Sequence, residues 1–275
     1  MNLTKIFDRF VYTHVKEAFD YLYNLSSMGK QESFPQTTKF IGHRGVFCHP
    51  TLKENTFAAF DAAVTLGAGI EFDIRLSSDG IPMVHHDSNL QRVFGIDAEI
   101  ANHSASEIQA TAPVPTLAEV LDRYGEKAPF LFIEDKNTPG NGGTQTSSRI
   151  IEAELKKRDL TQKAAVIALK TEIIEIYRQE TQDIKLAIIY MVSPKKALEY
   201  MQKHSNIGLM GWYATFPVEI EKQIPTHEKI FGCGFLNWDG TARRFARKGF
   251  PFLFSDRVDR VIPKIMSLQN NQPAK

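Results

Sequence analysis

Three acidic residues on two of the expected β-strands have the spacing of a metal site. Glu71 and Asp73 lie two residues apart in the apolar run 69–74, and Glu134 ends the run 130–134. Because side chains alternate between the two faces of a strand, Glu71 and Asp73 share one face. Neighbouring buried carboxylates repel one another and lose solvation, and a divalent cation relieves both costs. All-oxygen ligands favour a hard ion, so we expect one Mg²⁺ or Ca²⁺ on Glu71 and Asp73, with Glu134 as a third ligand.

Two histidines and two cations stand at strand ends beside these acids. His43 follows one apolar run, and His86 ends another. Histidine, with an unperturbed pKa of about 6.5, suits the proton transfers that phosphodiester hydrolysis needs at neutral pH. Arg44 offers a planar charged fork to phosphate oxygens, and Lys136, which shares the inward face with Glu134, would pair with an anion at the metal. A lone Glu-x-Asp is also typical of a strand edge or a salt bridge, but these neighbours favour the metal site.

Other polar residues receive a structural interpretation first. His85 precedes His86 and points to the opposite face of its strand, so we expect it to be structural. Asn55 stands before an alanine-rich helix and is expected to cap it, with a role in holding His43 or a substrate hydroxyl as the alternative. Single histidines are usually structural, and this applies to His14, His49, His103, His204 and His227.

The elements that position these residues alternate along the chain from residue 39. Nine strands are expected, at 40–43, 69–74, 82–86, 130–134, 165–169, 185–190, 207–212, 230–238 and 251–255. Six helices are expected between them, at 54–66, 116–124, 147–158, 171–180, 194–204 and 241–248. This alternation predicts an α/β protein with a TIM-like (β/α)₈ barrel, whose functional groups gather at the carboxyl ends of its strands. Since a barrel needs eight strands, we expect 207–212 or 230–238 to lie outside it.

Length and composition are consistent with that fold. The chain has 275 residues, where such a barrel typically needs about 250. The net charge of +1 offers no support for a nucleic-acid partner. The two cysteines, Cys48 and Cys233, are expected to be reduced structural thiols. No apolar run is long enough to span a bilayer, and the N-terminus lacks the layout of a secretory signal, so we expect a cytoplasmic protein.

The first 38 residues stand apart from the barrel. Residues 4–23 have apolar side chains at helical spacing, which predicts a helix that packs on the barrel. The alternative is a helix for peripheral membrane or partner contact, although its polar face mixes acidic and basic residues. Residues 25–38 have the composition of a linker. We therefore divide the chain into an N-terminal helix and linker, 1–38, and a barrel, 39–275. The oligomeric state is not predicted.

Taken together, the motifs resemble the glycerophosphodiester phosphodiesterase family. They are, in order, His43-Arg44-Gly45, Glu54-Asn55-Thr56, Glu71-x-Asp73, Asp79-Gly80-x-Pro82-x-Val84-x-His86-Asp87, Pro115-Thr116-Leu117-x-Glu119-Val120, Glu134-x-Lys136 and Ser255-Asp256. The resemblance implies a TIM barrel that hydrolyses a glycerophosphodiester to glycerol 3-phosphate and an alcohol. It implies one metal ion on the three carboxylates, His43 and His86 as the acid/base pair, Arg44 and Lys136 on the phosphate, and Glu54 near metal and substrate. Attack by the neighbouring glycerol hydroxyl and direct attack by water are both open.

The C-terminal half departs from the family's pattern. Leu169-Lys170 stands where relatives often carry Ser-Phe, and Trp238 is followed by Asp-Gly-Thr where they carry Thr-Val-Asn. Trp238 is expected to line the substrate pocket or to be a core aromatic. Asp135 replaces a residue that is usually apolar. These changes affect the part of the site expected to contact the alcohol.

Other functions on the same scaffold remain as alternatives. One is a lysophospholipase D or a sphingomyelinase D-like phosphodiesterase; the toxins of the latter type carry a disulfide-tied loop near the second histidine, and no cysteine lies near His86 here. Another is an inactive barrel that serves as a binding module. An inactive relative should have lost a ligand or a histidine, and the motifs of the first half are intact.

Overall fold

The expected alternation of strands and helices closes into a barrel. The computed structural model describes residues 21, 34–35, 37–139, 142–191, 195–204, 206–216 and 230–270. Eight parallel strands form the ring: β1 (Lys39–His43), β2 (Gly69–Leu76), β4 (Leu131–Asp135), β5 (Ala164–Ala168), β6 (Lys185–Tyr190), β7 (Ile207–Trp212), β8 (Phe231–Gly234) and β9 (Phe252–Ser255). Pairing of β1 with both β9 and β2 closes it. The TIM-like (β/α)₈ prediction is confirmed.

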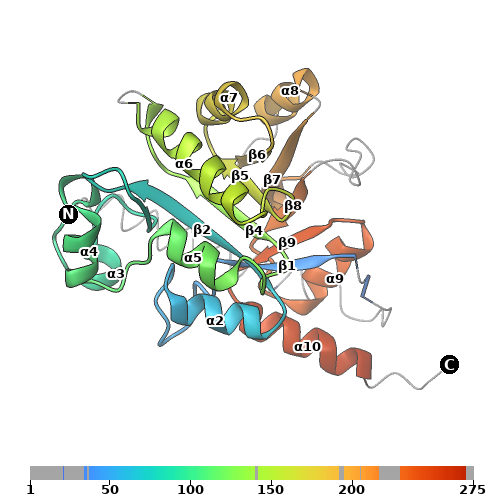
Figure 1. The fold of residues 1–275 in the computed structure, drawn as a ribbon. Coiled ribbons are helices and arrows are strands. Elements are labelled where there is room, and N and C mark those ends of the chain that lie inside the picture. Colours follow the sequence, from blue (N-terminus) through green and yellow to red (C-terminus); the bar gives the residue numbers. More distant parts are fainter. Residues whose placement is uncertain are drawn as a thin grey trace, which may run out of the picture.

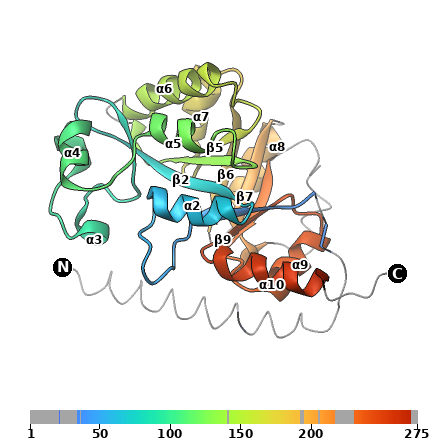
Figure 2. The ribbon, with the colours of Figure 1, turned by 60° about the horizontal axis from the view of Figure 1, so that its bottom comes forward.

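In the part of the chain that the structure describes, seven helices cover the outside of this ring, as Figures 1 and 2 show. They are α2 (Phe57–Thr65), α5 (Leu117–Tyr124), α6 (Gly143–Lys157), α7 (Thr171–Glu180), α8 (Lys195–Lys203), α9 (Asp239–Arg247) and α10 (Val258–Asn270). None of the helices in these described ranges is long and apolar enough to cross a bilayer. The expected helix 4–23 lies outside the described residues except for Tyr21, and so do residues 25–33 and 36 of the expected linker 25–38. The division of the chain at residue 38 stays a prediction.

The ninth strand is not the one expected. Strands 207–212 and 230–238 belong to the barrel, as β7 and β8, and the prediction that one of them lies outside is wrong. The additional strand is β3 (Pro82–Val84), which pairs antiparallel with the end of β2. β2 is eight residues long and extends beyond its barrel neighbours, and a turn at Gly80, with φ of 77°, reverses the chain onto it.

A small lobe follows β3 at this end of the barrel (Figure 1). It contains α3 (Gln91–Phe94), the 3₁₀ turn η1 (Ile100–Asn102) and α4 (Ala105–Thr111), none of which was predicted. The lobe has its own apolar cluster, which includes Met83, Leu90, Ile100 and Ile108. This cluster fixes the segment between β3 and α5 against the mouth of the barrel.

Alternation along β2 separates two environments, as predicted. Ile70, Phe72 and Ile74 belong to the large cluster between the strands and the helices. Glu71 and Asp73 take the opposite face, toward the barrel axis. Below them, a second cluster fills the barrel interior, and four phenylalanine rings dominate it: Phe130, Phe132, Phe252 and Phe254.

Candidate active site

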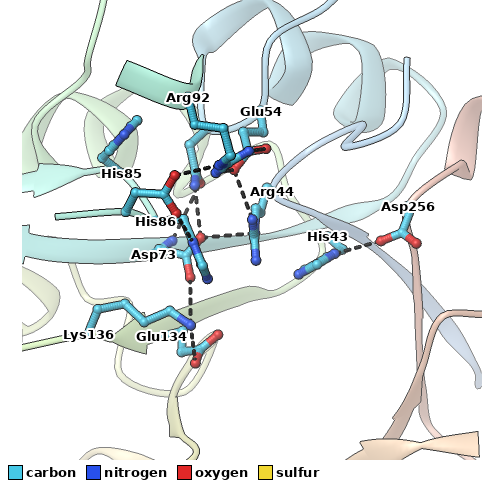
Figure 3. A network of polar contacts seen from close by, with 12 residues as sticks. His43, Arg44, Glu54, Asp73, His85, His86, Arg92, Glu134, Lys136 and Asp256 are labelled. Carbon is cyan, nitrogen blue, oxygen red and sulfur yellow. Dashed lines mark hydrogen bonds and ion pairs between the residues drawn. The ribbon is translucent and has the colours of Figure 1, made fainter. Parts of the chain in front are cut away.

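A cavity of about 460 Å³ opens at the carboxyl ends of the strands. Six of the residues singled out from the sequence line it: His43, Arg44, Glu71, His86, Glu134 and Lys136. They come from β1, β2 and β4 and from the segment after β3 (Figure 3). The structure therefore brings together residues that are up to 93 positions apart in the chain, from His43 to Lys136.

The three carboxylates meet in the way a metal site requires. One oxygen each of Glu71, Asp73 and Glu134 lies within 4.8 Å of the other two. Asp73 stands opposite Glu134 in the register of β2 and β4, which places both on the same level of the barrel. Glu71 Oε1 and Asp73 Oδ1 are buried and accept no hydrogen bond from the described residues. Buried oxygens without donors fit a divalent cation that prefers oxygen ligands.

The charges in this cluster are strongly coupled. Burial, followed by the charges of Asp73 and Glu134, raises the pKa of Glu71 well above its usual range. Burial also disfavours the charge of Asp73, but Arg44 and Lys136 outweigh it and lower the pKa of that carboxyl. Glu71 therefore resists ionisation in the absence of a cation, whereas Asp73 is ionised.

Two cations lie against the carboxylates (Figure 3). Arg44 Nη1 donates to Glu54 Oε1 at 2.8 Å, and Arg44 Nε lies 3.2 Å from Asp73 Oδ2. Lys136 Nζ lies 2.5 Å from Glu134 Oε1 and 3.3 Å from Asp73 Oδ1, the latter an ion pair without hydrogen-bond geometry. Both side chains remain on the cavity wall, where an anion would meet them.

The loop that carries Arg44 has an unusual backbone. Arg44 has a φ of 53° and Gly45 a φ of 82°. A Cβ on Gly42 would lie 2.2 Å from the carbonyl oxygen of Gly45, so the turn needs glycine there as well. This conformation directs the backbone N–H of Arg44 to Glu71 Oε2 at 2.9 Å. Strain of this kind is typical of functional sites.

Each candidate histidine is held by a carboxylate at Nδ1. His43 Nδ1 lies 2.6 Å from Asp256 Oδ1, and Asn237 donates to the other oxygen of that aspartate at 2.9 Å. His86 Nδ1 lies 2.7 Å from Asp87 Oδ1. A carboxylate at Nδ1 favours the tautomer with the proton there, which leaves Nε2 available to a reacting group. Burial and then Arg44 lower the pKa of His43 despite Asp256, so its neutral form prevails at neutral pH.

A further arginine, which the sequence interpretation missed, connects the two sides of this network. Arg92, on α3, donates to both oxygens of Glu54, each at 2.6 Å, and pairs with Asp87. Glu54 also accepts from Arg44, and Asp87 orients His86. Burial disfavours the charge of Glu54, but Arg92 and Arg44 outweigh it and lower its pKa. Hydrogen bonds and ion pairs form a continuous chain from His86 through Asp87, Arg92 and Glu54 to Arg44.

Asn55 has a different position from the one expected. Asn55 does not cap α2, because the cap is Thr56, whose side chain accepts from the backbone N–H of Ala59. With a φ of 55°, Asn55 instead donates from Nδ2 to Asp73 Oδ2 at 2.9 Å. The capping prediction is wrong. Asn55 has a supporting role, as in the alternative, but the side chain that it holds is Asp73 and not His43.

Trp238 is not among the residues that line the cavity. It is half-buried at the N-terminus of α9, and the guanidinium of Arg260 lies 3.7 Å from the centre of its ring. Its ring also meets that of Tyr21 at 5.1 Å. The expectation that Trp238 lines the pocket is therefore corrected: helix α9 begins at this point and turns the indole toward α10.

The remaining histidines that the structure describes stay outside the cavity. His85 is buried on the lobe side, with Nε2 3.3 Å from the carbonyl oxygen of Asn89, in keeping with a structural role (Figure 3). His49 contacts Thr51, and His103 contacts the backbone of Glu99. His14 and His227 lie outside the described residues.

The other wall of the cavity is apolar and was not predicted. It carries Ile167, Leu169, Ile189, Met191, Met210, Phe47, Phe235 and Phe254. Residues 167 and 189 lie in β5 and β6, and residues 169 and 191, two positions further on, directly follow these strands. That spacing was the available signal, but it is equally typical of a packed barrel core.

Comparison with known proteins agrees with this geometry. Residues 43–218 match the family model described as "Glycerophosphoryl diester phosphodiesterase family". A glycerophosphodiester phosphodiesterase of Bacillus altitudinis is 34% identical over 249 residues, 82% of this chain and 97% of that one. A glycerophosphodiester phosphodiesterase structure from Thermotoga maritima shares the fold with a TM-score of 0.68 at 24% identity, over 84% of this chain and 98% of that one.

A second solved structure is that of an Oleispira antarctica phosphodiesterase in complex with the product sn-glycerol-3-phosphate. It has a TM-score of 0.69 at 23% identity and covers 86% of this chain and 98% of its own. The barrel fold together with the family match identifies the chain as a phosphoric diester hydrolase of the TIM-barrel class. The chain belongs to the glycerophosphodiester phosphodiesterase family, and the resemblance stated from its motifs is confirmed.

Proposed function

We propose that this enzyme hydrolyses glycerophosphodiesters to glycerol 3-phosphate and an alcohol, with one divalent cation, Mg²⁺ or Ca²⁺, on Glu71, Asp73 and Glu134. The carboxylate cluster carries the proposal, because one oxygen of each of the three residues lies within 4.8 Å of the other two. In addition, Glu71 Oε1 and Asp73 Oδ1 are buried and accept no hydrogen bond from the described residues. The relative from Oleispira antarctica, whose complex holds sn-glycerol-3-phosphate, supports the identity of the product.

The cation supplies Lewis-acid stabilisation of a phosphoryl oxygen when it is bound. The residues of the chain do the remaining work. Arg44 and Lys136 present charged donors at the cavity wall and stabilise the negative charge that builds up on the other phosphoryl oxygens. Glu54 is 6% exposed and holds Arg44, so it acts on the phosphate through that side chain.

His43 and His86 form the acid/base pair of the proposal. One takes the proton of the attacking hydroxyl or water, and the other gives a proton to the leaving oxygen. Asp256 and Asp87 hold Nδ1 of the two rings, which leaves Nε2 of each ring for the transfer. The base enters the step with Nε2 unprotonated and receives the proton there, whereas the acid enters with a proton on Nε2 and gives it to the leaving oxygen. The neutral state that burial and Arg44 favour in His43 suits the role of base at the start of the reaction.

The experiment is a metal-controlled assay of glycerol 3-phosphate release from glycerophosphocholine and several diesters with other head groups. We expect EDTA to abolish release, and Mg²⁺ or Ca²⁺ to restore it. Titration of metal into the stripped protein by calorimetry should show one site, and that site should be weakened in Glu71→Gln and Asp73→Asn. Absence of turnover on every head group with Mg²⁺, Ca²⁺ or Mn²⁺ present would overturn the proposal. Unchanged metal affinity in both variants would remove the two residues from the ligand set.

A further inference from the structure

The cavity has two chemically different halves. The polar half comes from β1, β2 and β4, the segment after β3, and the pair Asn237 and Asp256. The other half comes from the ends of β5, β6, β7 and β8 and the residues directly after them. Every lining residue that this second half contributes within the described ranges is aliphatic, a methionine, a phenylalanine or a glycine. We name it the apolar wall, and its side chains are Ile167, Leu169, Ile189, Met191, Met210 and Phe235.

The apolar wall is continuous with the candidate site. Met210 and Ile167 pack in the cluster that fills the barrel below the carboxylates, and Ile189 packs against it. Phe235 meets the ring of His43 edge-on, at 5.7 Å between centroids. A phosphodiester held by Arg44 and Lys136, next to a cation on the carboxylates, would therefore have one of its substituents against this wall.

The wall is a poor partner for a small polar substituent. A glycerol or sugar hydroxyl pressed against it would give up its hydrogen bonds to water and meet no side-chain donor or acceptor from the wall. A hydrocarbon chain loses nothing there and gains by leaving water. Methionine side chains suit this purpose, because they adapt to chains of different shape.

The apolar surface also extends to the outside of the barrel. Leu169 follows β5 at the cavity rim and is 50% exposed, whereas Ile167, two residues earlier, is buried. An isolated exposed leucine is ordinary, but this one continues a buried apolar surface out to solvent. A hydrocarbon chain that extends from the phosphate would thus contact Ile167 and then Leu169.

We propose that the preferred substrates are glycerophosphodiesters that carry one hydrocarbon chain, and that the apolar wall binds this chain. This inference rests on the proposed function. The chemistry is that of the proposed reaction: an oxygen, from water overall, bonds to phosphorus, the P–O bond to the alcohol breaks, and the alcohol leaves with a proton. The chain is carried either by the glycerol, as an acyl group, or by the alcohol, as an alkyl group. The shared feature is one apolar substituent beside a single anionic phosphodiester.

Two substrate series test the proposal and separate these sources. One is glycerophosphocholine with acyl chains of increasing length on the glycerol, and the other is glycerophosphoryl alkanols of increasing length. Chains are kept short enough to stay monomeric in solution. We expect kcat/KM to rise by about fourfold per buried methylene in one of the two series, until the chain leaves the wall. The series that responds identifies which side of the phosphodiester lies on the wall.

A matched pair of variants tests the role of the wall itself. Leu169→Asn changes an exposed position at the rim, and Ile81→Asn changes an exposed position, 40% accessible, in the turn between β2 and β3 away from the cavity. We expect Leu169→Asn to lower the ratio of kcat/KM for the chain-bearing over the chain-free substrate by about fourfold or more, and Ile81→Asn to leave that ratio unchanged. Both positions are exposed, so neither variant should fail to fold.

The outcomes separate this inference from the proposed function. If glycerophosphocholine is hydrolysed but kcat/KM does not rise, or falls, with chain length in both series, the inference is overturned and the proposed function stands. If kcat/KM rises with chain length but Leu169→Asn and Ile81→Asn reduce this rise equally, the role of the wall is overturned as well. Absence of EDTA-sensitive turnover on every substrate, with or without a chain, refutes the proposed function itself.

Discussion

The two sides of the barrel mouth are built on different principles. On the side of β1, β2 and β4, nearly every polar side chain has a charged partner: Arg44 contacts both Glu54 and Asp73, and Lys136 contacts both Asp73 and Glu134. On the side of β5 to β8, contacts are apolar and without direction. A change on the first side leaves a buried charge without its partner, whereas a change on the second alters only shape and volume.

This difference separates chemistry from selectivity. In the proposed mechanism the charged side contacts the phosphate, which is common to all phosphodiesters. The apolar side can be altered without disturbing that machinery. We therefore expect variants on the charged side to affect all substrates alike, and variants on the apolar wall to change the order of preference among substrates.

The largest effect is expected at the two histidines. His43→Ala and His86→Ala should each lower kcat by about 10² to 10⁴, as is usual for a positioned acid or base. The loss should be of similar size on chain-free and chain-bearing substrates. Steady-state kinetics on both classes measures it, with His103→Ala, in the lobe outside the cavity, as the control. If either histidine variant keeps full activity, that histidine has no part in the reaction.

A smaller effect is expected at Arg92, which contacts neither the carboxylate cluster nor the cavity in the described structure. Arg92→Gln should lower kcat by about tenfold to 100-fold, because Glu54 and Asp87 lose the partner that fixes them and, through them, Arg44 and His86. Arg123→Gln breaks an exposed pair with Asp61 and serves as the control.

Arg92→Lys sharpens that test. A lysine keeps the charge but cannot span Glu54 and Asp87 with a planar fork, so it should restore only part of the lost kcat. Equal activity of the lysine and glutamine variants and the wild type would show that the arginine is a surface charge without influence on the site. A fall in melting temperature without a fall in kcat would assign Arg92 to the fold alone.

The smallest effect on turnover is expected on the outer face of β4. Asp135 accepts from Ser147, Tyr177 and Asn137 and is buried behind the barrel, away from the cavity. Burial raises the pKa of Asp135. Asp135→Asn should leave kcat within about threefold but lower the melting temperature by about 2–4 °C, since the donors around it lose an acceptor.

The pH dependence of that stability difference has a definite sign. Because the folded-state pKa of Asp135 lies above the unfolded value, its contribution to the free energy of unfolding is fully present below the unfolded pKa and is lost as pH rises through the folded one. The deficit of Asp135→Asn relative to wild type should therefore be larger near pH 4 than at pH 7.5 in thermal melts. A deficit that grows with pH would contradict the raised pKa.

The charged side was largely predictable because its residues stand at strand ends. His43, Glu71 and Glu134 each interrupt or end a short apolar run, and strand alternation alone places Glu71 and Asp73 on the inner face. Closure of the barrel then brings the runs together. Asn55 was misjudged, because a residue before a helix is usually a cap, and its contact with Asp73 depends on the positive φ that the preceding loop imposes.

Other features depend on information that is not local. Strand β3 is as apolar as its neighbours, and only its antiparallel pairing with β2 shows that it lies outside the ring. Arg92 stands 38 residues from Glu54, on a short helix that was not expected. Helix α10 was also missed, and Pro263 within it is a residue that helix interiors disfavour. The apolar wall escaped prediction because its spacing matches that of ordinary core.

The phenylalanine cluster beneath the cavity has a kinetic consequence. Phe130, Phe132 and Phe252 pack ring against ring, and Phe254 forms the floor of the cavity above them. Among the described residues, these rings fill the barrel beneath the cavity, so in the proposed reaction the substrate and both products pass through the opening at the carboxyl ends of the strands. The next substrate molecule can enter only after the last product has left, so that product competes with the substrate for the free site.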